Sequence, residues 1–192
     1  DEQHQAEEQG DDIPQLSDLR TTESILRCFY DTITFTFDEV DKISGATCAV
    51  DLDIELRVSS PDALSEFLRS YLAVEDVDAP DDGTPIIRKG KKITKKVLRL
   101  SKMHGIPTLR VESNALISMV AARDVVDPDT GEVLVECNEE ISQDALNRIT
   151  QSAVASVEVL LIDRSVGGDA LSNTFMKDSI RTKTDALLEI YR

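Results

Sequence analysis

The chain has 192 residues, of which 41% are hydrophobic and 30% charged, and its formal net charge is −16. This composition predicts a globular protein with one domain or two small ones. The charge argues against a free-standing nucleic-acid binder and against an anionic membrane surface as partner. The three cysteines form no CxxC pair, which argues against a disulfide framework or a zinc site and favours reduced thiols in a cytoplasmic protein. No apolar run approaches the length of a transmembrane helix, so no membrane span is expected.

The part of the chain before Pro80 predicts an acidic tail followed by an α+β segment. Residues 1–18 begin with six acidic side chains in a dozen positions, and we expect them to form a flexible tail. Residues 19–80 predict, in order, a helix capped by Thr22, a strand over 32–37, a strand over 48–58 and a helix that begins with Ser60 and Pro61. An acidic loop follows, and we place a boundary near Pro80.

An internal repeat with a 48-residue period comes next. Gly83 and Gly131 each open a copy, and ten positions later each copy has an isoleucine followed by a hydroxyl residue, Ile93-Thr94 or Ile141-Ser142. Further matching apolar positions are Leu98 and Leu146, Leu109 and Val157, and Val111 and Val159. The alternative is chance agreement between two amphipathic patterns.

Each copy predicts a short strand, a helix capped by Thr94 or Ser142, and a closing strand. We expect the two strand–helix–strand units to pair into one small sheet with two packed helices, as the core of residues 81–165. Between the copies, the sequence DPDTG at 127–131 is a strong turn signal. It predicts a hairpin that joins strands at 117–126 and 132–136.

Candidate catalytic groups are few. His104 precedes Gly105 near a helix end, where we expect it to face solvent and to interact favourably with the helix dipole. Cys137 has no histidine or lysine close in sequence to activate it, so we expect a small buried hydrophobic residue. The acidic loop 76–82 lacks the spacing of an EF-hand. The glycines at 167–168 match neither a dinucleotide-binding pattern nor a P-loop and predict a turn.

One concentrated group of charges remains, residues 88–102, which we call the basic segment. It has eight basic residues in fifteen positions and no acidic one: Arg88, Lys89, Lys91, Lys92, Lys95, Lys96, Arg99 and Lys102. Two interpretations stay open. The segment forms either a surface that contacts nucleic-acid phosphates, or a solvated helix face that pairs with the acidic loops. The candidate phosphate contacts are Lys91, Lys92, Lys95 and Lys96. No aromatic residues are interleaved, which argues against stacking on single strands.

Residues 166–192 predict a return segment and a terminal helix. Leu187, Leu188 and Tyr191 have the spacing of one apolar helix face, and no Gly, Asn or Pro follows to end the helix. Because the chain also starts without a methionine, we expect a segment of a longer protein. We expect the exposed apolar face to drive dimerisation of this segment.

Three stretches resemble, in this order, the β subunit of bacterial DNA-directed RNA polymerase. They are GKKITKKVLRLSK at 90–102, AARDVVDPDTGEVLVECNEEIS at 121–142 and KTDALLEIYR at 183–192. The resemblance is to the lobe region of that subunit and the lineage-specific insertion that the lobe carries. It covers residues 19–192 and is strongest from Gly83 onward. In the family the last helix continues into a proline-rich segment, which this chain lacks.

The resemblance implies DNA-templated RNA synthesis by a multisubunit nucleotidyltransferase in the bacterial cytoplasm, at the nucleoid. The implied partners are the β′, α, ω and σ subunits. The family holds its catalytic Mg²⁺ on the β′ subunit, so we expect no catalytic, cofactor-binding or metal-binding residue in this chain. The lobe forms one side of the cleft for downstream DNA.

We therefore expect an α+β fold in which small mixed sheets and packed helices are built around the two repeats, as part of a larger subunit. The expected division is an acidic tail at 1–18, a lobe-side segment at 19–80, an insertion core at 81–165 and a return segment with a lobe helix at 166–192. We expect a structural and regulatory lobe-insertion module near downstream duplex DNA. The alternative is a docking module for transcription regulators that does not contact DNA. A stand-alone enzyme would need an acid/base or nucleophile pair that the sequence does not offer.

Overall fold

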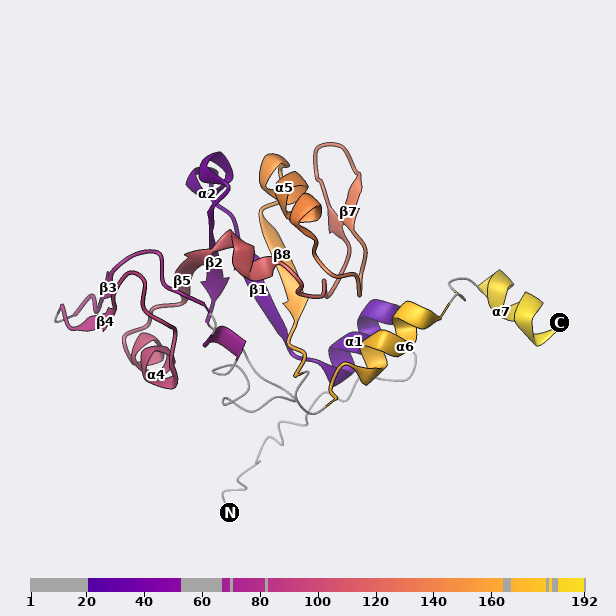
Figure 1. The fold of residues 1–192 in the computed structure, drawn as a ribbon, viewed down its shortest axis with the longest axis horizontal. Helices are drawn as coiled ribbons and strands as arrows, with labels where there is room; N and C mark the ends of the chain where they lie inside the picture. The colour runs from indigo at the N-terminus through magenta and orange to yellow at the C-terminus, as the bar shows by residue number, and fades with distance from the viewer. Residues whose placement is uncertain are drawn as a thin grey trace, which may run out of the picture.

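A computed structural model describes residues 21–52, 67–69, 71–81, 83–163, 167–178, 180 and 183–191. Helices and small antiparallel sheets alternate along the chain (Figure 1), which confirms the predicted α+β fold. Three predictions lie outside the described residues: the acidic tail, the second half of the strand predicted over 48–58, and the helix start at Ser60.

Four of the described strands form an antiparallel sheet at the centre of the molecule (Figure 1). β1 (Thr32–Thr36) and β2 (Thr47–Asp51) lie in the middle, β5 (Thr108–Glu112) pairs with β2, and β8 (Ser156–Leu160) pairs with β1. Alternate residues of β1 and β5 are buried, as expected of a sheet with one face on the core. The closing strands of both repeat units lie in this one sheet, as expected, but the expected pairing of the two units with each other is wrong. β1 and β2 separate the closing strands, because segments that precede the repeats supply their hydrogen-bond partners.

A short helix precedes each of the two central strands. α1 (Thr22–Phe29) is capped by Thr21 rather than by Thr22, because the Thr21 hydroxyl accepts a hydrogen bond from the Ser24 N–H at 3.1 Å. α2 (Glu39–Ser44) was not predicted. Its cap is Asp38, which accepts from the Asp41 N–H at 2.8 Å, and the helix ends at Gly45 in the left-handed conformation.

The 48-residue repeat is present in the backbone. Its first copy contains β3 (Val77–Asp78), β4 (Pro85–Ile87), α4 (Lys95–Met103) and β5, and its second contains β6 (Val125–Val126), β7 (Val133–Val135), α5 (Gln143–Gln151) and β8. Each of these elements of the second copy starts 48 residues after its counterpart in the first copy. The hairpin predicted around Pro128 forms from β6 and β7 and is shorter than predicted.

The two copies differ at the start of their helices. Ser142 caps α5 by accepting a hydrogen bond from the Ala145 N–H at 3.1 Å. Thr94 stands at the N-cap of α4, but its side chain makes no capping hydrogen bond to the described residues of that helix. The predicted cap is therefore confirmed for Ser142 only.

The repeat begins before the glycine turns, in two extended segments at 71–74 and 119–122. The Ala73 N–H donates to the Lys91 carbonyl at 3.0 Å, and the Ala121 N–H donates to the Glu139 carbonyl at 2.9 Å. Ala73 also bridges to β5 and Ala121 bridges to β8. The two segments thereby cover the outer edges of the sheet, which would otherwise expose unpaired backbone groups.

One large hydrophobic core joins the sheet to both copies of the repeat. Corresponding residues of the two copies are buried alike: Ile93 and Ile141, Leu68 and Leu116, Val111 and Val159. The β3–β4 hairpin spans Pro80, and the sheet takes strands from both sides of it. The division of the chain near Pro80 stays a prediction.

The remaining elements join or follow the repeats. The 3₁₀ helix η1 (Ser113–Leu116) connects the copies, and α6 (Ala170–Lys177) lies beside α1 (Figure 1). α7 (Lys183–Ile190) follows at the far end, and the side chains of Leu187, Leu188 and Tyr191 are exposed there. Within the described ranges, no helix combines the length and the apolar character needed to cross a membrane.

Candidate nucleic-acid interface

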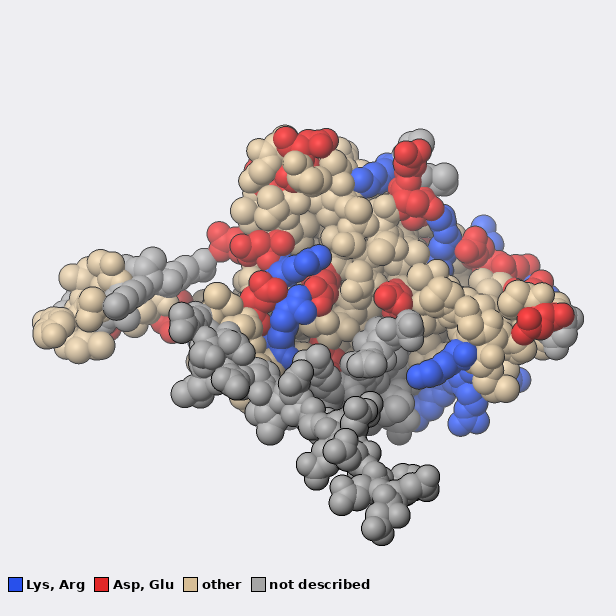
Figure 2. Space-filling view, turned by 180° about the vertical axis from the view of Figure 1, so that it is seen from behind, with Lys and Arg blue, Asp and Glu red and all other residues tan. Residues whose placement is uncertain are grey.

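The basic segment lies on the outside of the first repeat, over the turn after β4 and the outer face of α4. All eight of its Lys and Arg residues are exposed. Basic side chains gather along the lower edge of the α4 end of the face shown in Figure 2, acidic side chains lie above them at the same end, and basic and acidic side chains are mixed near the centre. The four candidate lysines are therefore accessible to a ligand, and their contact with phosphates stays a prediction.

The backbone explains why these side chains point outward. Gly90 takes the left-handed conformation, φ 75°, in the turn after β4, and two fully or largely buried residues, Ile93 and Val97, then anchor the chain to the core. Lys91 and Lys92 lie on one side of the Ile93 anchor, and Lys95 and Lys96 open α4 on the other. The apolar anchors fix the surface positions of the lysines between them.

Most of this positive charge is not neutralised by neighbouring acidic residues. Arg88 pairs with Asp78 at 2.7 Å and with Asp76 at 3.7 Å. In the described part of the chain, Lys91, Lys92 and Lys96 form no ion pair. The interpretation as a solvated face paired with acidic loops therefore applies to Arg88 and not to these three lysines.

The start of α4 carries charge of the wrong sign for a helix. A helix N-terminus has a partial positive charge and is stabilised by acidic residues in the first turn. α4 has none there and begins with Lys95 and Lys96 instead, whereas α5 has Asp144 in its first turn. Positive side chains at a positive helix end are unfavourable by themselves, and a bound anion would stabilise this end of α4.

The second repeat has the same backbone and the opposite charge. At the 48-residue offset, Lys91 corresponds to Glu139, Lys92 to Glu140, Lys96 to Asp144 and Arg88 to Glu136. The stretch 136–150 holds four acidic side chains and one basic one, against eight basic and no acidic side chains in 88–102. The basic character is therefore not required by the structure of the repeat. Alignment of the two copies would have revealed this signal from the sequence.

The other groups considered in the sequence have structural roles. His104 is the C-cap of α4, with Nδ1 at 3.6 Å from the Asp81 carboxylate, and its side chain is only 18% exposed, so the expected solvent-facing position is wrong. Cys137 is half-buried, and burial raises the pKa of its thiol to about 11. That pKa leaves almost no thiolate near neutral pH, so Cys137 is a poor nucleophile.

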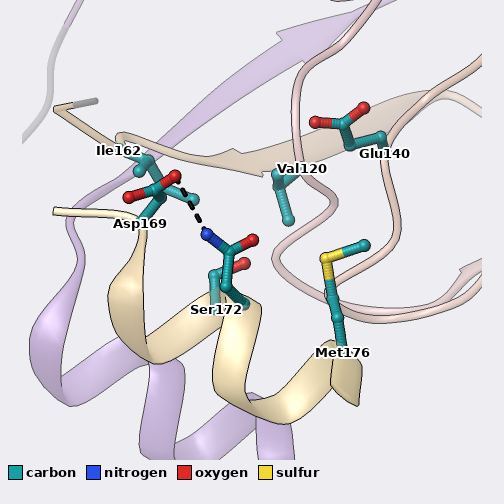
Figure 3. A pocket seen from close by; sticks show the side chains of 7 residues that line it. Val120, Glu140, Ile162, Asp169, Ser172 and Met176 are labelled. Atoms are coloured by element: carbon teal, nitrogen blue, oxygen red, sulfur yellow. Dashed lines mark hydrogen bonds between the residues drawn. The ribbon is translucent and has the colours of Figure 1, made fainter. Parts of the chain in front are cut away.

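A pocket of ≈ 150 Å³ lies between α6 and the 119–122 segment (Figure 3), away from the basic segment. Its lining includes the carboxylates of Glu140 and Asp169, and the Asn173 side chain donates to Asp169 at 3.0 Å. Nowhere among the described residues do three His, Cys, Asp or Glu side chains gather to hold a metal ion. Sequence reasoning did not find this pocket, because it depends on the docking of α6.

Comparison with known proteins gives a consistent result. No protein-family model matches the chain. The chain is similar to three proteins named DNA-directed RNA polymerase subunit beta. The protein from Koribacter versatilis is 33% identical to it over 91% of this chain, and the protein from Sorangium cellulosum is 31% identical over 90%. The protein from an Anaeromyxobacter species is 30% identical over 90% of this chain. The chain spans about 11% of the length of each of these relatives.

Proposed function

Because the chain is related to a segment of the β subunit of DNA-directed RNA polymerases, we propose that it is a module of that subunit which contacts duplex DNA through the basic segment. Lys91, Lys92, Lys95 and Lys96 bind backbone phosphates in this proposal. The observation that carries it is the charge inversion between two repeats that share one backbone.

The proposed contact is electrostatic and independent of base sequence. Lysines bind phosphates as point charges and release condensed counterions, which favours binding at low salt. The surface presents no aromatic side chain for stacking, since the segment 88–102 contains none. Duplex DNA, which offers a regular array of phosphates, is therefore the form of nucleic acid that this surface suits.

The wider role follows from the similarity to the β subunit. We propose that the chain acts as a structural and regulatory lobe-insertion module beside downstream DNA, within a nucleotidyltransferase that carries out DNA-templated transcription at the bacterial nucleoid. The other polymerase subunits are its partners in that assembly. In this proposal the chemistry, including the bound Mg²⁺, belongs to another subunit.

A second candidate function is the docking of transcription regulators without contact to DNA. The observation in its favour is the net charge of −16, which repels DNA from most of the molecule. The acidic face of the second repeat would be the docking surface in that case. The two candidates differ in a simple respect, because only the first predicts affinity for DNA.

The test is duplex binding by fluorescence anisotropy across a salt series. The variant Lys91→Glu/Lys96→Glu is compared with the control Lys42→Glu/Lys177→Glu, which changes the net charge equally at sites outside the basic segment. We expect weak binding that falls as salt rises, a loss of at least about tenfold in the first variant, and a smaller loss in the control. No binding by the parent chain at low salt, or equal losses in the two variants, would contradict the DNA contact.

A further inference from the structure

The second repeat shows how a helix docks on this module. α6 lies against the segment 119–122 and against α1. Val120 and Ala122 of that segment form a buried cluster with Leu160 of β8, and each of the three is at most 4% exposed. Leu171 and Phe175 of α6 pack against this cluster. Side-chain hydrogen bonds hold the helix in place: the Asn138 amide donates to the Ser172 carbonyl at 2.9 Å, and the Ser172 hydroxyl donates to Asn138 at 2.6 Å.

The first repeat has the same backbone at this position. The Val74 N–H donates to the Arg110 carbonyl at 3.1 Å, as the Ala122 N–H donates to the Glu158 carbonyl at 2.8 Å. Leu72 bridges to Lys92, as Val120 bridges to Glu140. The backbone on which α6 docks is therefore present twice, although Glu112 stands in the first repeat where Leu160 belongs to the apolar cluster.

A covering helix of this kind is seen on the second repeat only. α2 precedes β2 as α1 precedes β1, and α4 matches α5, but α6 has no counterpart among the described helices of the first repeat. Leu72, which corresponds to the buried Val120, is 39% exposed. Val74 is half-buried, and Lys89, Gly90 and Glu112 around it are exposed. We call this the Leu72 face.

The chemistry of the Leu72 face specifies the kind of helix that fits it. Gly90 stands where Asn138 binds α6, and a side chain added at Gly90 would meet no atom of the described chain within 4 Å, so there is room above it. Lys92 stands where Glu140 lines the pocket together with Asn173 and Met176 of α6. Lys89 adds a second positive charge. A helix docked as α6 docks would need acidic residues, in place of Asn173, beside its apolar stripe.

We propose that the Leu72 face is a docking site for an amphipathic helix of a partner protein, with an apolar stripe on Leu72 and Val74 and an acidic flank toward Lys89 and Lys92. The α6 of a second copy does not fit this role. Ser172 of α6 is 2% exposed and its N–H also binds the Tyr30 hydroxyl at 3.3 Å, so α6 is held within its own chain. This inference does not depend on the DNA contact.

The probe for the test is a synthetic peptide of residues 167–178 that carries Asn173→Glu, compared with the same peptide carrying Asn173→Lys. Binding is followed by amide NMR shifts in the ¹⁵N-labelled full chain. We expect shifts at residues 72–74 and 89–92 with the glutamate peptide, and at least about tenfold weaker binding of the lysine peptide. Leu72→Asp abolishes the shifts, whereas Val133→Asp, at a similarly exposed apolar residue of the second repeat, retains them.

Three results would overturn the proposal. They are the absence of shifts at millimolar peptide, shifts that Leu72→Asp leaves unchanged, and shifts at 72–74 that appear with rising protein concentration alone, which would make a second copy the occupant. Duplex anisotropy on Leu72→Asn, which removes the apolar side chain without adding charge, separates this inference from the proposed function. We expect unchanged DNA binding in that variant, because its lysines and its net charge are intact.

Discussion

Arg110 and Glu158 occupy the same position in the two repeats and carry opposite charges. Arg110 binds Asp41 of α2 at 3.1 Å and also pairs with Asp38, while Glu158 binds Arg27 of α1 at 2.6 Å. Each of the two repeats thus holds the helix before its central strand by an ion pair of reversed polarity. The same position of one backbone therefore binds an acidic partner in the first repeat and a basic partner in the second.

The Glu158 pair makes stability depend on pH. Burial opposes ionisation of Glu158, but hydrogen bonds and the charge of Arg27 outweigh it, so the pKa of Glu158 lies below its ordinary value of 4.5. A lowered pKa in the folded state adds stability above the pKa of the unfolded chain, and this stability is lost as the pH falls through the folded pKa. Glu158→Gln should therefore lower the free energy of unfolding by about 1–3 kcal/mol at pH 7.

Urea unfolding of this variant at several pH values provides the measurement. The difference from the parent chain should begin to shrink below about pH 4.5 and disappear as the pH falls through the lowered pKa of folded Glu158, because residue 158 is then uncharged in both chains. Glu112→Gln is the control, since Glu112 is exposed and forms no ion pair among the described residues. A constant difference down to pH 2 would contradict the assigned pair.

Ser101 offers a stabilising substitution. Its side chain is fully buried in α4, its hydroxyl has no hydrogen-bond partner among the described residues, and its counterpart in the second repeat is the buried Ile149. Ser101→Ala removes an unsatisfied polar group, so we expect the free energy of unfolding to rise by about 1–3 kcal/mol. Thermal and urea unfolding would measure it.

Ser113→Ala is the matched control for that substitution. Ser113 is equally buried, but its hydroxyl donates to the Gly45 carbonyl at 2.7 Å. We expect its loss to lower stability by about 1 kcal/mol, because the carbonyl then lacks this partner. If both serines behaved alike, the assignment of Ser101 as unsatisfied would be refuted.

Asn138 should be a determinant of α6 docking. It takes the left-handed conformation, φ 66°, as its counterpart Gly90 does. Asn138→Gly keeps that backbone but removes both hydrogen bonds to Ser172, so we expect a loss of about 1–3 kcal/mol. The reverse change, Gly90→Asn, should alter stability by less than about 1 kcal/mol. Hydrogen exchange of the α6 amides would show faster opening in the first variant only.

Charge alone should be enough to transfer DNA binding to the second repeat. Glu139→Lys/Asp144→Lys places lysines at the positions that correspond to Lys91 and Lys96. In a chain that also carries Lys91→Glu/Lys96→Glu, we expect these two changes to restore at least about tenfold in duplex affinity at low salt. If affinity is not restored, a feature of the first repeat other than its charge is needed for the contact.

Sequence patterns predicted those parts of the structure that depend on interactions between residues close together in the sequence. The repeat was visible because Gly83 and Gly131 are needed in left-handed turns and Ile93 and Ile141 are buried anchors. The pairing of the strands was predicted wrongly, because it depends on contacts between β1 and β8, which lie far apart in the sequence. α2 was missed, since so short a helix cannot show a clear apolar period.

The candidate site shows the same division. The exposure of the lysines in 88–102 was predictable from their positions around Ile93 and Val97. The absence of ion pairs at Lys91, Lys92 and Lys96 within the described part of the chain was not, because Arg88 pairs with Asp76 and Asp78 through the β3–β4 hairpin. The Leu72 face was not predictable either. It is recognised only when the position of α6 on the second repeat is known.

The central claim is that the first repeat, and not the second, contacts DNA. The most direct measurement is an amide NMR map of the ¹⁵N-labelled chain with a short duplex at low salt. We predict shifts at Lys91, Lys92, Lys95 and Lys96 that disappear as salt is raised, and none at the corresponding residues 139, 140, 143 and 144. Shifts at the second repeat, or none at the first, would contradict the claim.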